Sequence, residues 1–200
     1  MDLRSYDAIV LAGGRSSRAG GSNKLGLRRD GRSLLSYAVE AVSGAGRVIV
    51  VGPPAAEIVD PRIIWCREDP PFAGPVAAIA AALAHVEADV VIVLAGDQPA
   101  AAPAVPALLK NLAGRGESDD LNIVQLSAAV LVDVDGVRQP LTAAYRTSWL
   151  AAVTSNAPLG TGMRSLIRLI DVAEVVDRWQ AATDIDTEAD ATRLGFGLAD

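Results

Sequence analysis

The chain contains a single cysteine, Cys66, and a single histidine, His85, among its 200 residues. One cysteine cannot form a disulfide within the chain or a cysteine-rich zinc site, and we expect it to pack in a buried strand. The lone histidine lies inside an expected alanine-rich helix, where we expect it to pack or to face solvent. The sequence therefore offers no plausible serine–histidine or cysteine–histidine pair for nucleophilic catalysis.

Long apolar runs are also absent. No run approaches the roughly 18 residues of a membrane span, and the run Ala8–Ala12 is too short for a signal peptide core and follows Asp2 and Asp7. The net charge of −6 and the pI of about 4.8 disfavour nonspecific nucleic-acid binding. Half of the residues are hydrophobic, which is typical of a globular chain. We expect a cytoplasmic protein without nucleic-acid or membrane partners.

In the first half of the chain, apolar runs of strand length alternate with segments of helix length. The Val- and Ile-rich runs lack polar alternation, so they indicate strands covered on both faces. The pattern predicts an α/β fold with one doubly wound, mostly parallel sheet, in a single domain over residues 1–200. The expected strands are Ala8–Ala12, Arg47–Val51, Ile63–Cys66 and Val90–Ala95, and the expected helices are Leu34–Val42 with Ser33 as N-cap, Pro75–Glu87 and Pro103–Leu112.

The second half changes character. An Asp135-Gly136 turn between two apolar runs predicts a β-hairpin that forms a small subregion. The polar run Gly114–Asp120 is typical of a surface loop. The hairpin strands are expected over Ala128–Asp133 and Val137–Tyr145, helices over Thr147–Thr154, Arg164–Ile170 and Thr187–Leu194, the last capped by Thr187, and a late edge strand over Val172–Val176.

A glycine-rich, basic loop, Leu11–Lys24, directly follows the first expected strand. Its glycines let backbone N–H groups approach an anion, and Arg15, Arg18 and Lys24 add positive charge. These features suit the phosphate tail of a nucleoside triphosphate. The residue after Lys24 is Leu25, so the loop is not a Walker A motif, and its glycines do not fit the dinucleotide fingerprint. A glycine-rich turn with solvated arginines is the alternative.

Acidic residues follow other elements of the expected sheet. Asp97 comes after the strand Val90–Ala95, at the same sheet edge as the glycine-rich loop, and a carboxylate there suits Mg²⁺. The alternative is a turn residue close to Pro99. Asp184 and Asp186 alternate, as on a short strand, so they face the same side and either could reach the metal. Asp186 could equally be an ordinary residue before the last helix.

The loop after the third strand adds two candidates. Gly74 opens the alanine-rich helix, whose first N–H groups could face a base or an anion. Asp69 could accept hydrogen bonds from the ring N–H and the exocyclic amine of guanine. An ordinary loop carboxylate is the alternative for Asp69.

The glycine-rich loop resembles the signature loop of nucleotidyltransferases and is most similar to that of the molybdenum cofactor guanylyltransferases. The resemblance covers about 180 residues, because further motifs follow in that family's order. It implies transfer of GMP from GTP to the phosphate of molybdopterin, with release of pyrophosphate and with Mg²⁺ as cofactor. It also implies transient contact with enzymes that donate or receive the cofactor. The motifs are Leu11–Lys24, Glu68–Pro75, Gly96–Pro99, Gln139–Leu141 with Tyr145, Gly160–Leu166 and Asp184–Thr187.

The residues and the resemblance together predict the site. The nucleotide would be bound by Leu11, Ala12, Gly13, Gly14, Arg15, Ser16, Lys24, Asp69, Gly74 and Asp97. The catalytic groups would be Arg18, Lys24 and Asp97, the metal ligands Asp97 and Asp186, and the acceptor-binding residues Gln139, Pro140 and Tyr145.

The sequence departs from the family at three positions. Ala19 stands where methionine is common, Asn23 where aspartate is common, and Val51 where relatives often place an asparagine. Three alternative hypotheses therefore remain. The nucleotide could be CTP, the acceptor could be another small phosphate or a sugar phosphate, or the protein could bind a nucleotide without turning it over.

Overall fold

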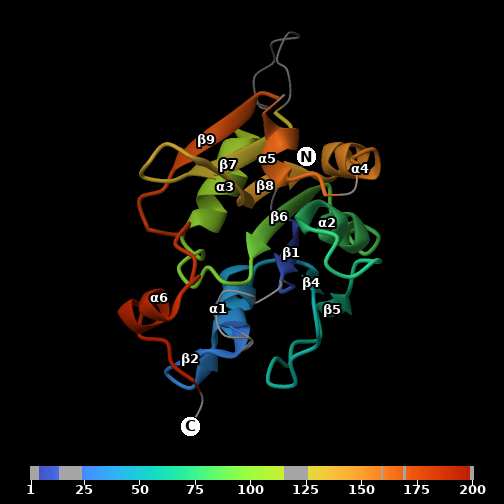
Figure 1. The fold of residues 1–200 in the computed structure, drawn as a ribbon. Coiled ribbons are helices and arrows are strands. Elements are labelled where there is room, and N and C mark those ends of the chain that lie inside the picture. Colours follow the sequence, from blue (N-terminus) through green and yellow to red (C-terminus); the bar gives the residue numbers. More distant parts are fainter. Residues whose placement is uncertain (1–4, 14–23, 115–125, 159, 169, 199–200) are drawn as a thin grey trace.

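The structure, a computed structural model, describes residues 5–13, 24–114, 126–158, 160–168 and 170–198. A seven-stranded sheet with the order β5-β4-β1-β6-β8-β7-β9 forms its centre (Figure 1). Strands β5, β4, β1 and β6 are parallel, as are β7 and β9, whereas β8 is antiparallel to both of its neighbours. The mostly parallel sheet is therefore confirmed. The strands are β1 (Asp7–Leu11), β4 (Val48–Val51), β5 (Ile63–Cys66), β6 (Val90–Ala95), β7 (Ala128–Val132), β8 (Arg138–Arg146) and β9 (Val172–Val176).

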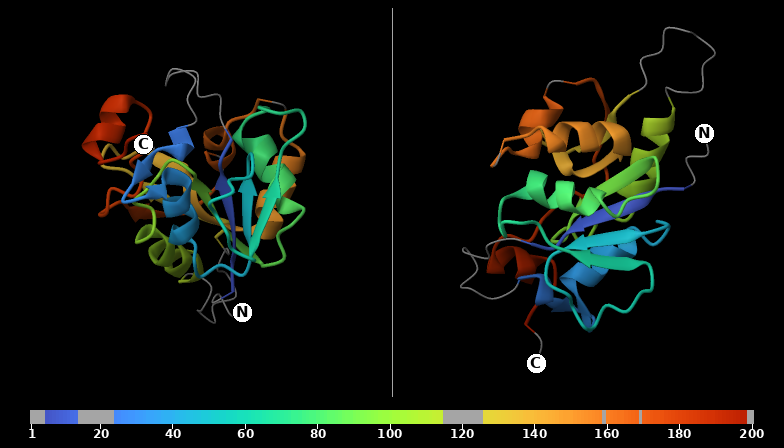
Figure 2. Two further views of the ribbon diagram at one scale, coloured as in Figure 1. Left: turned by 90° about the horizontal axis from the view of Figure 1, so that it is seen from below. Right: turned by 90° about the vertical axis from the view of Figure 1, so that its right-hand side faces the viewer.

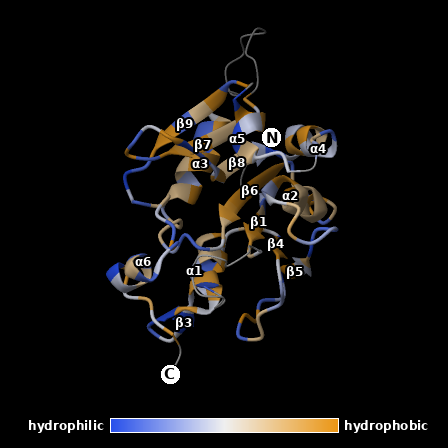
Figure 3. Ribbon diagram, in the orientation of Figure 1, coloured by the Kyte–Doolittle hydropathy of each residue, from blue (hydrophilic) through white to orange (hydrophobic). Residues whose placement is uncertain are grey.

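Helices cover both faces of the sheet, as the two views of Figure 2 show. Alternate residues of β1 point to opposite faces of the sheet. Ala8 and Val10 pack in the hydrophobic core under α1 and α3, and Ile9 packs in the core under α2, α4 and α5. The inner strands are accordingly the most hydrophobic part of the ribbon (Figure 3). The helices are α1 (Leu34–Ala41), α2 (Pro75–Leu83), α3 (Ala104–Ala113), α4 (Thr147–Ser155), α5 (Met163–Ile167) and α6 (Glu188–Arg193).

The predicted hairpin forms, but it is not a small subregion. Strand β8 pairs with β6 on one side and with β7 on the other, so the hairpin extends the main sheet. The hydroxyl of Thr142 on β8 donates a 2.6 Å hydrogen bond to the Gln98 side chain, which follows β6. Both side chains are buried, so this bond fixes β8 beside the loop that leaves β6.

Helix α2 ends at Leu83, four residues before the predicted end at Glu87. The carboxylate of Asp7, which is buried at the start of β1, accepts hydrogen bonds from the backbone N–H groups of Glu87 and Ala88 at 2.8 and 3.0 Å. Its other oxygen accepts from the N–H of Arg47 at 2.9 Å. The N–H groups of His85 and Val86 bond to carbonyls three residues back, and those of Glu87 and Ala88 bond to Asp7, so the segment does not continue as an α-helix.

Two short strands, β2 (Arg28–Arg29) and β3 (Arg32–Ser33), form a separate two-stranded sheet that the sequence did not indicate. They precede α1, and a 3₁₀ turn, η1 (Lys24–Gly26), precedes them. Ser33 is the N-cap residue of α1, but its hydroxyl bonds to that of Ser36 rather than to a backbone N–H. At α6, by contrast, Thr187 forms the predicted cap as a capping box with Asp190.

Candidate functional site

A cavity of about 310 Å³ opens at the edge of the sheet where the parallel strands end. Parallel α/β sheets place their ligands beyond the carboxyl ends of the strands, and this cavity has that position. The start of α2 forms one wall, and Gly74 there has a φ of 99°, a conformation that favours glycine. The lining residues are Leu11, Gly13, Val51, Glu68, Phe72, Gly74, Pro75, Ala78, Ala95, Asp97 and Leu141.

An ion cluster lies beside this cavity. The ammonium nitrogen of Lys24 is 2.6 Å from a carboxylate oxygen of Asp97 and 3.0 Å from one of Asp186. Burial alone would lower the pKa of Lys24, but the hydrogen bonds and charges of the two carboxylates more than offset that effect and raise its pKa. Lys24 therefore stays charged and holds together two acids that are distant from it in the sequence.

A backbone hydrogen bond brings Asp186 to this place. The N–H of Ile185 donates to the carbonyl of Asp97 at 3.2 Å, and the Ile185 side chain is buried against Leu34 and Phe196. The segment around it is not a strand, so the predicted short strand is wrong, although Asp184 still lies close enough to Asp186 and Asp97 to feel their charges. Burial, followed by the negative charges of Asp186 and Asp97, raises the pKa of the Asp184 carboxyl.

The chemistry of this cluster fits a divalent cation. Oxygens of Asp97 and Asp186 converge on one positive atom, the Lys24 nitrogen. Mg²⁺ is usually held by one or two carboxylates, with phosphates and water completing its shell. No group of three or more acidic, histidine or cysteine side chains suited to a metal exists within the described residues. Among the described residues, two carboxylates are therefore available for the ion, and a phosphate ligand would supply further oxygens.

Only the two ends of the glycine-rich loop belong to the described residues. Gly14, Arg15, Ser16 and Arg18 lie outside the described residues. Of the other predicted nucleotide ligands, Leu11, Gly13, Gly74 and Asp97 line the cavity. Ala12 is buried, and its N–H donates to the carbonyl of Val51 at 2.8 Å, so it fixes the start of the loop instead of lining the cavity.

The structure separates two neighbouring acids that the sequence could not distinguish. Asp69 is exposed and does not line the cavity. Glu68 does line it, is only 9% exposed, and accepts a 2.9 Å hydrogen bond from the N–H of Phe72. Glu68 is therefore the carboxylate of this pair that a nucleotide base in the cavity would meet.

The residues predicted to bind the acceptor lie away from the cavity. Tyr145 has no exposed surface, stacks on Trp149, and donates its hydroxyl to the carbonyl of Pro140 at 2.7 Å. Pro140 is itself buried, and the amide of Gln139 donates to Asp133 at 2.6 Å. In this structure Tyr145 is a core residue with no route to a bound molecule, because it is covered on every side.

Comparison with known proteins decides the family. A family model described as the MobA-like NTP transferase domain matches residues 8–178. The chain belongs to the MobA-like NTP transferase domain family. It is thus a nucleotidyltransferase by family, and the predicted resemblance is confirmed at this level. No helix in the described part of the chain is long and apolar enough to cross a membrane.

Individual relatives are more distant. A molybdenum cofactor guanylyltransferase from Shewanella amazonensis is 28% identical over 102 residues, which are 50% of this chain and 52% of that protein. A second one, from Shewanella piezotolerans, is 25% identical over 98 residues, 48% of each chain. The chain thus spans about half the length of the curated relatives it matches.

Solved structures confirm the fold of this MobA-like chain. Rv0371c from Mycobacterium tuberculosis superposes with a TM-score of 0.72 at 23% identity, covering 95% of this chain and 97% of that one. Molybdopterin-guanine dinucleotide biosynthesis protein A from Archaeoglobus fulgidus gives 0.65 at 22% identity, covering 94% and 96%. 2-C-methyl-D-erythritol 4-phosphate cytidylyltransferase from Thermus thermophilus gives 0.67 at 19%, covering 94% and 95%. At these identities the likeness concerns the fold alone.

Proposed function

We propose that this protein transfers GMP from GTP to the phosphate of molybdopterin and releases pyrophosphate. The observation that carries the proposal is the ion cluster: one lysine ammonium bridges two carboxylates directly beside a cavity at the carboxyl edge of the sheet. A nucleotidyl transfer needs such a cluster, because two anions must be brought together and their charge neutralised. The curated relatives named as molybdenum cofactor guanylyltransferases support this choice of acceptor.

Guanine is the base that suits the cavity. The buried Glu68 carboxylate keeps acceptor capacity beyond its bond to Phe72. Guanine presents a ring N–H and an exocyclic amine side by side, and a carboxylate can accept from both. The first turn of α2, which begins at Pro75, also lies beside the same cavity, and the first N–H groups of a helix favour an electronegative partner.

In the proposed reaction an oxygen of the acceptor phosphate attacks the α-phosphorus of GTP. The bond between that phosphorus and the oxygen leading to the β-phosphate breaks, and pyrophosphate leaves with the electron pair. Lys24 would exchange its carboxylate partners for phosphate oxygens and neutralise the leaving group. Arg15 and Arg18, which lie outside the described residues, would add positive charge there. The acceptor phosphate is already ionised, so no strong general base is required.

Asp97 and Asp186 are the residues that would hold Mg²⁺. When bound, the ion supplies positive charge to the triphosphate. One oxygen of each carboxylate already lies within hydrogen-bond distance of the Lys24 nitrogen, so the two acids would share the binding of a cation beside the cavity.

The proposal is tested by pyrophosphate release from the purified protein with Mg²⁺ and molybdopterin, comparing GTP, CTP, ATP and UTP. We expect release with GTP, and a loss of orders of magnitude in the Asp97→Ala variant with its fold retained. Release with CTP alone would make the protein a cytidylyltransferase. Thermal stabilisation by GTP without release under any condition would indicate a binding protein that does not turn over.

A further inference from the structure

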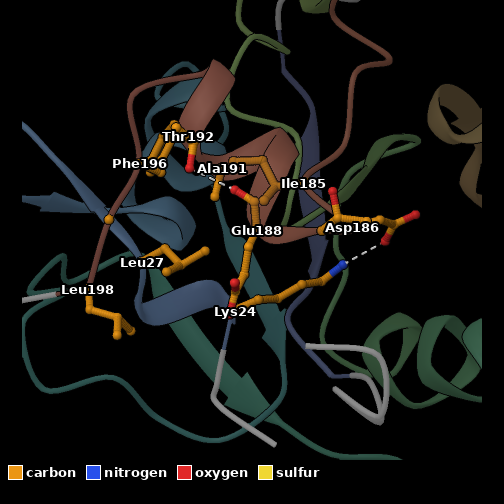
Figure 4. Close-up of a pocket in the computed structure, with 11 residues that line it drawn as sticks. Lys24, Leu27, Ile185, Asp186, Glu188, Ala191, Thr192, Phe196 and Leu198 are labelled. Carbon is orange, nitrogen blue, oxygen red and sulfur yellow. Dashed lines mark hydrogen bonds and ion pairs between the residues drawn. The ribbon is translucent and has the colours of Figure 1, made fainter. Parts of the chain in front are cut away.

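A second cavity, of about 300 Å³, adjoins the ion cluster (Figure 4). It shares no lining residue with the cavity described above. The two cavities nevertheless meet at the cluster, since Asp97 lines the first while Lys24 and Asp186 line the second. The 2.6 Å contact between Lys24 and Asp97 thus joins two binding spaces at one charged point.

The walls of this second cavity are mostly apolar away from the cluster. Leu27, Phe196 and Leu198 line it, and in Figure 4 Leu27 and Leu198 lie at the opposite side from Asp186. The Lys24 side chain extends along it, with its ammonium directed to Asp186. The cavity therefore offers a cation for an anionic group at one end and apolar surface for an organic body at the other.

The apolar wall is held in place before any ligand arrives. The Phe196 ring meets Tyr37 edge to face with the centroids 5.4 Å apart, and the guanidinium of Arg29 lies 4.6 Å from the centroid of each ring. The N–H of Phe196 also donates to the carbonyl of Ala191 at 2.8 Å. A wall fixed in this way loses little conformational freedom when a ligand binds.

We propose that this second cavity binds the organic body of the phosphorylated acceptor. The assignment rests on the proposed transferase function, and it names the acceptor class: a phosphomonoester with a compact, partly apolar body. Its phosphate would lie at the end of the cavity that adjoins the ion cluster, on the side of the α-phosphorus away from the pyrophosphate. N–H or O–H donors on its body would face the carboxylates of Asp186 and Glu188, which line the same cavity.

Reaction geometry supports this division of the two cavities. In an in-line displacement the attacking oxygen and the leaving pyrophosphate lie on opposite sides of the α-phosphorus. The nucleotide and the acceptor therefore need separate cavities, and the α-phosphate of the one and the phosphate of the other must meet where these cavities adjoin. The cluster of Lys24, Asp97 and Asp186 is the place in the described residues where the two cavities meet.

The test compares two tryptophan substitutions on α6. Thr192 is exposed and lines the cavity, so Thr192→Trp would fill it without disturbing the core. Ala189 is exposed on the same helix and does not line the cavity, so Ala189→Trp is the matched control. Equilibrium binding of molybdopterin and of phenyl phosphate is measured for each protein, with inorganic phosphate as the ligand that lacks a body. The KM values for molybdopterin and GTP are measured in parallel.

We expect Thr192→Trp to weaken molybdopterin binding and to raise its KM at least tenfold, while the KM for GTP and all properties of Ala189→Trp stay within twofold. Equal molybdopterin binding by the wild type and Thr192→Trp would overturn the assignment. So would a wild type that binds phenyl phosphate no better than inorganic phosphate. Pyrophosphate release tests the transferase function separately. If the wild type binds molybdopterin and Thr192→Trp does not, but the wild type releases no pyrophosphate, the transferase function is refuted and the assignment of the cavity is supported.

Discussion

Replacing Lys24 with methionine tests the ion cluster directly. The Lys24 side chain is 23% exposed and that of Asp97 18%, whereas that of Asp186 is 57% exposed. The Lys24–Asp97 pair therefore lies between a surface pair, which contributes about 0–1 kcal/mol, and a buried pair, whose disruption costs about 3–5 kcal/mol. We expect Lys24→Met to lower the free energy of unfolding by about 1–2 kcal/mol. In a chain of this size that loss lowers Tm by about 2–8 °C.

Mg²⁺ provides the second half of this experiment. Without the ammonium, two carboxylates face each other uncompensated, so Mg²⁺ should raise the Tm of Lys24→Met by more than that of the wild type. GTP binding should weaken by about 10–100-fold, because a charge-assisted hydrogen bond contributes about 1.5–3 kcal/mol. Lys110, the other lysine of the chain, is exposed on α3 and gives the control Lys110→Met. An unchanged Tm, with no larger response to Mg²⁺, would refute the role of the cluster as a cation site.

Three further predictions follow from single residues. Because the pKa of Asp184 is raised, its ionised form lowers the stability of the protein above that pKa and has no effect below the ordinary value of 3.8. Asp184→Asn should therefore raise Tm at pH 7, and thermal unfolding at lower pH should show this increase in Tm shrinking to zero by pH 3. Glu68→Gln should weaken GTP binding by about tenfold or more, whereas Asp69→Asn should not, and the opposite order in a nucleotide competition assay would contradict the cavity assignment. A Cβ on Gly52 would lie 2.8 Å from backbone atoms of the loop that leaves β1, so Gly52→Ala should lower the free energy of unfolding in denaturant by about 1–3 kcal/mol. In the control Gly26→Ala the new Cβ lies in open space and the loss should be less than about 0.5 kcal/mol; equal losses would show that the backbone around Gly52 moves to make room.

Much of the sheet could be predicted from the sequence because its strands are short apolar runs between turn residues. The bounds of β5, β6 and β9 agree with those predicted. Strands β2 and β3 could not be foreseen, because two-residue strands such as Arg28–Arg29 show neither alternation nor an apolar run. The position of the hairpin was also missed, since a hairpin pattern fixes the pairing of β7 with β8 but says nothing of the pairing of β8 with β6.

The site could be predicted in outline but not in its contacts. The sheet edge followed from the ends of the strands, and Asp97 and Asp186 were candidates by position. The lysine that joins them was not foreseen as a partner, because it is 73 residues from one acid and 162 from the other. Adjacent acids such as Glu68 and Asp69 differ only in the direction in which the loop turns them, which no local pattern encodes.

The order of the strands has a consequence for synthesis on the ribosome. Strands β5, β4, β1 and β6 are complete once residue 95 has emerged, but β6 lacks its other neighbour until β8, residues 138–146, is made. During that interval the nascent chain carries an open, apolar strand edge, which is where aggregation begins. The bond between Lys24 and Asp186 closes later still. The growing chain thus assembles its sheet from one side and gains the complete ion cluster only when the segment that carries Asp186 folds back.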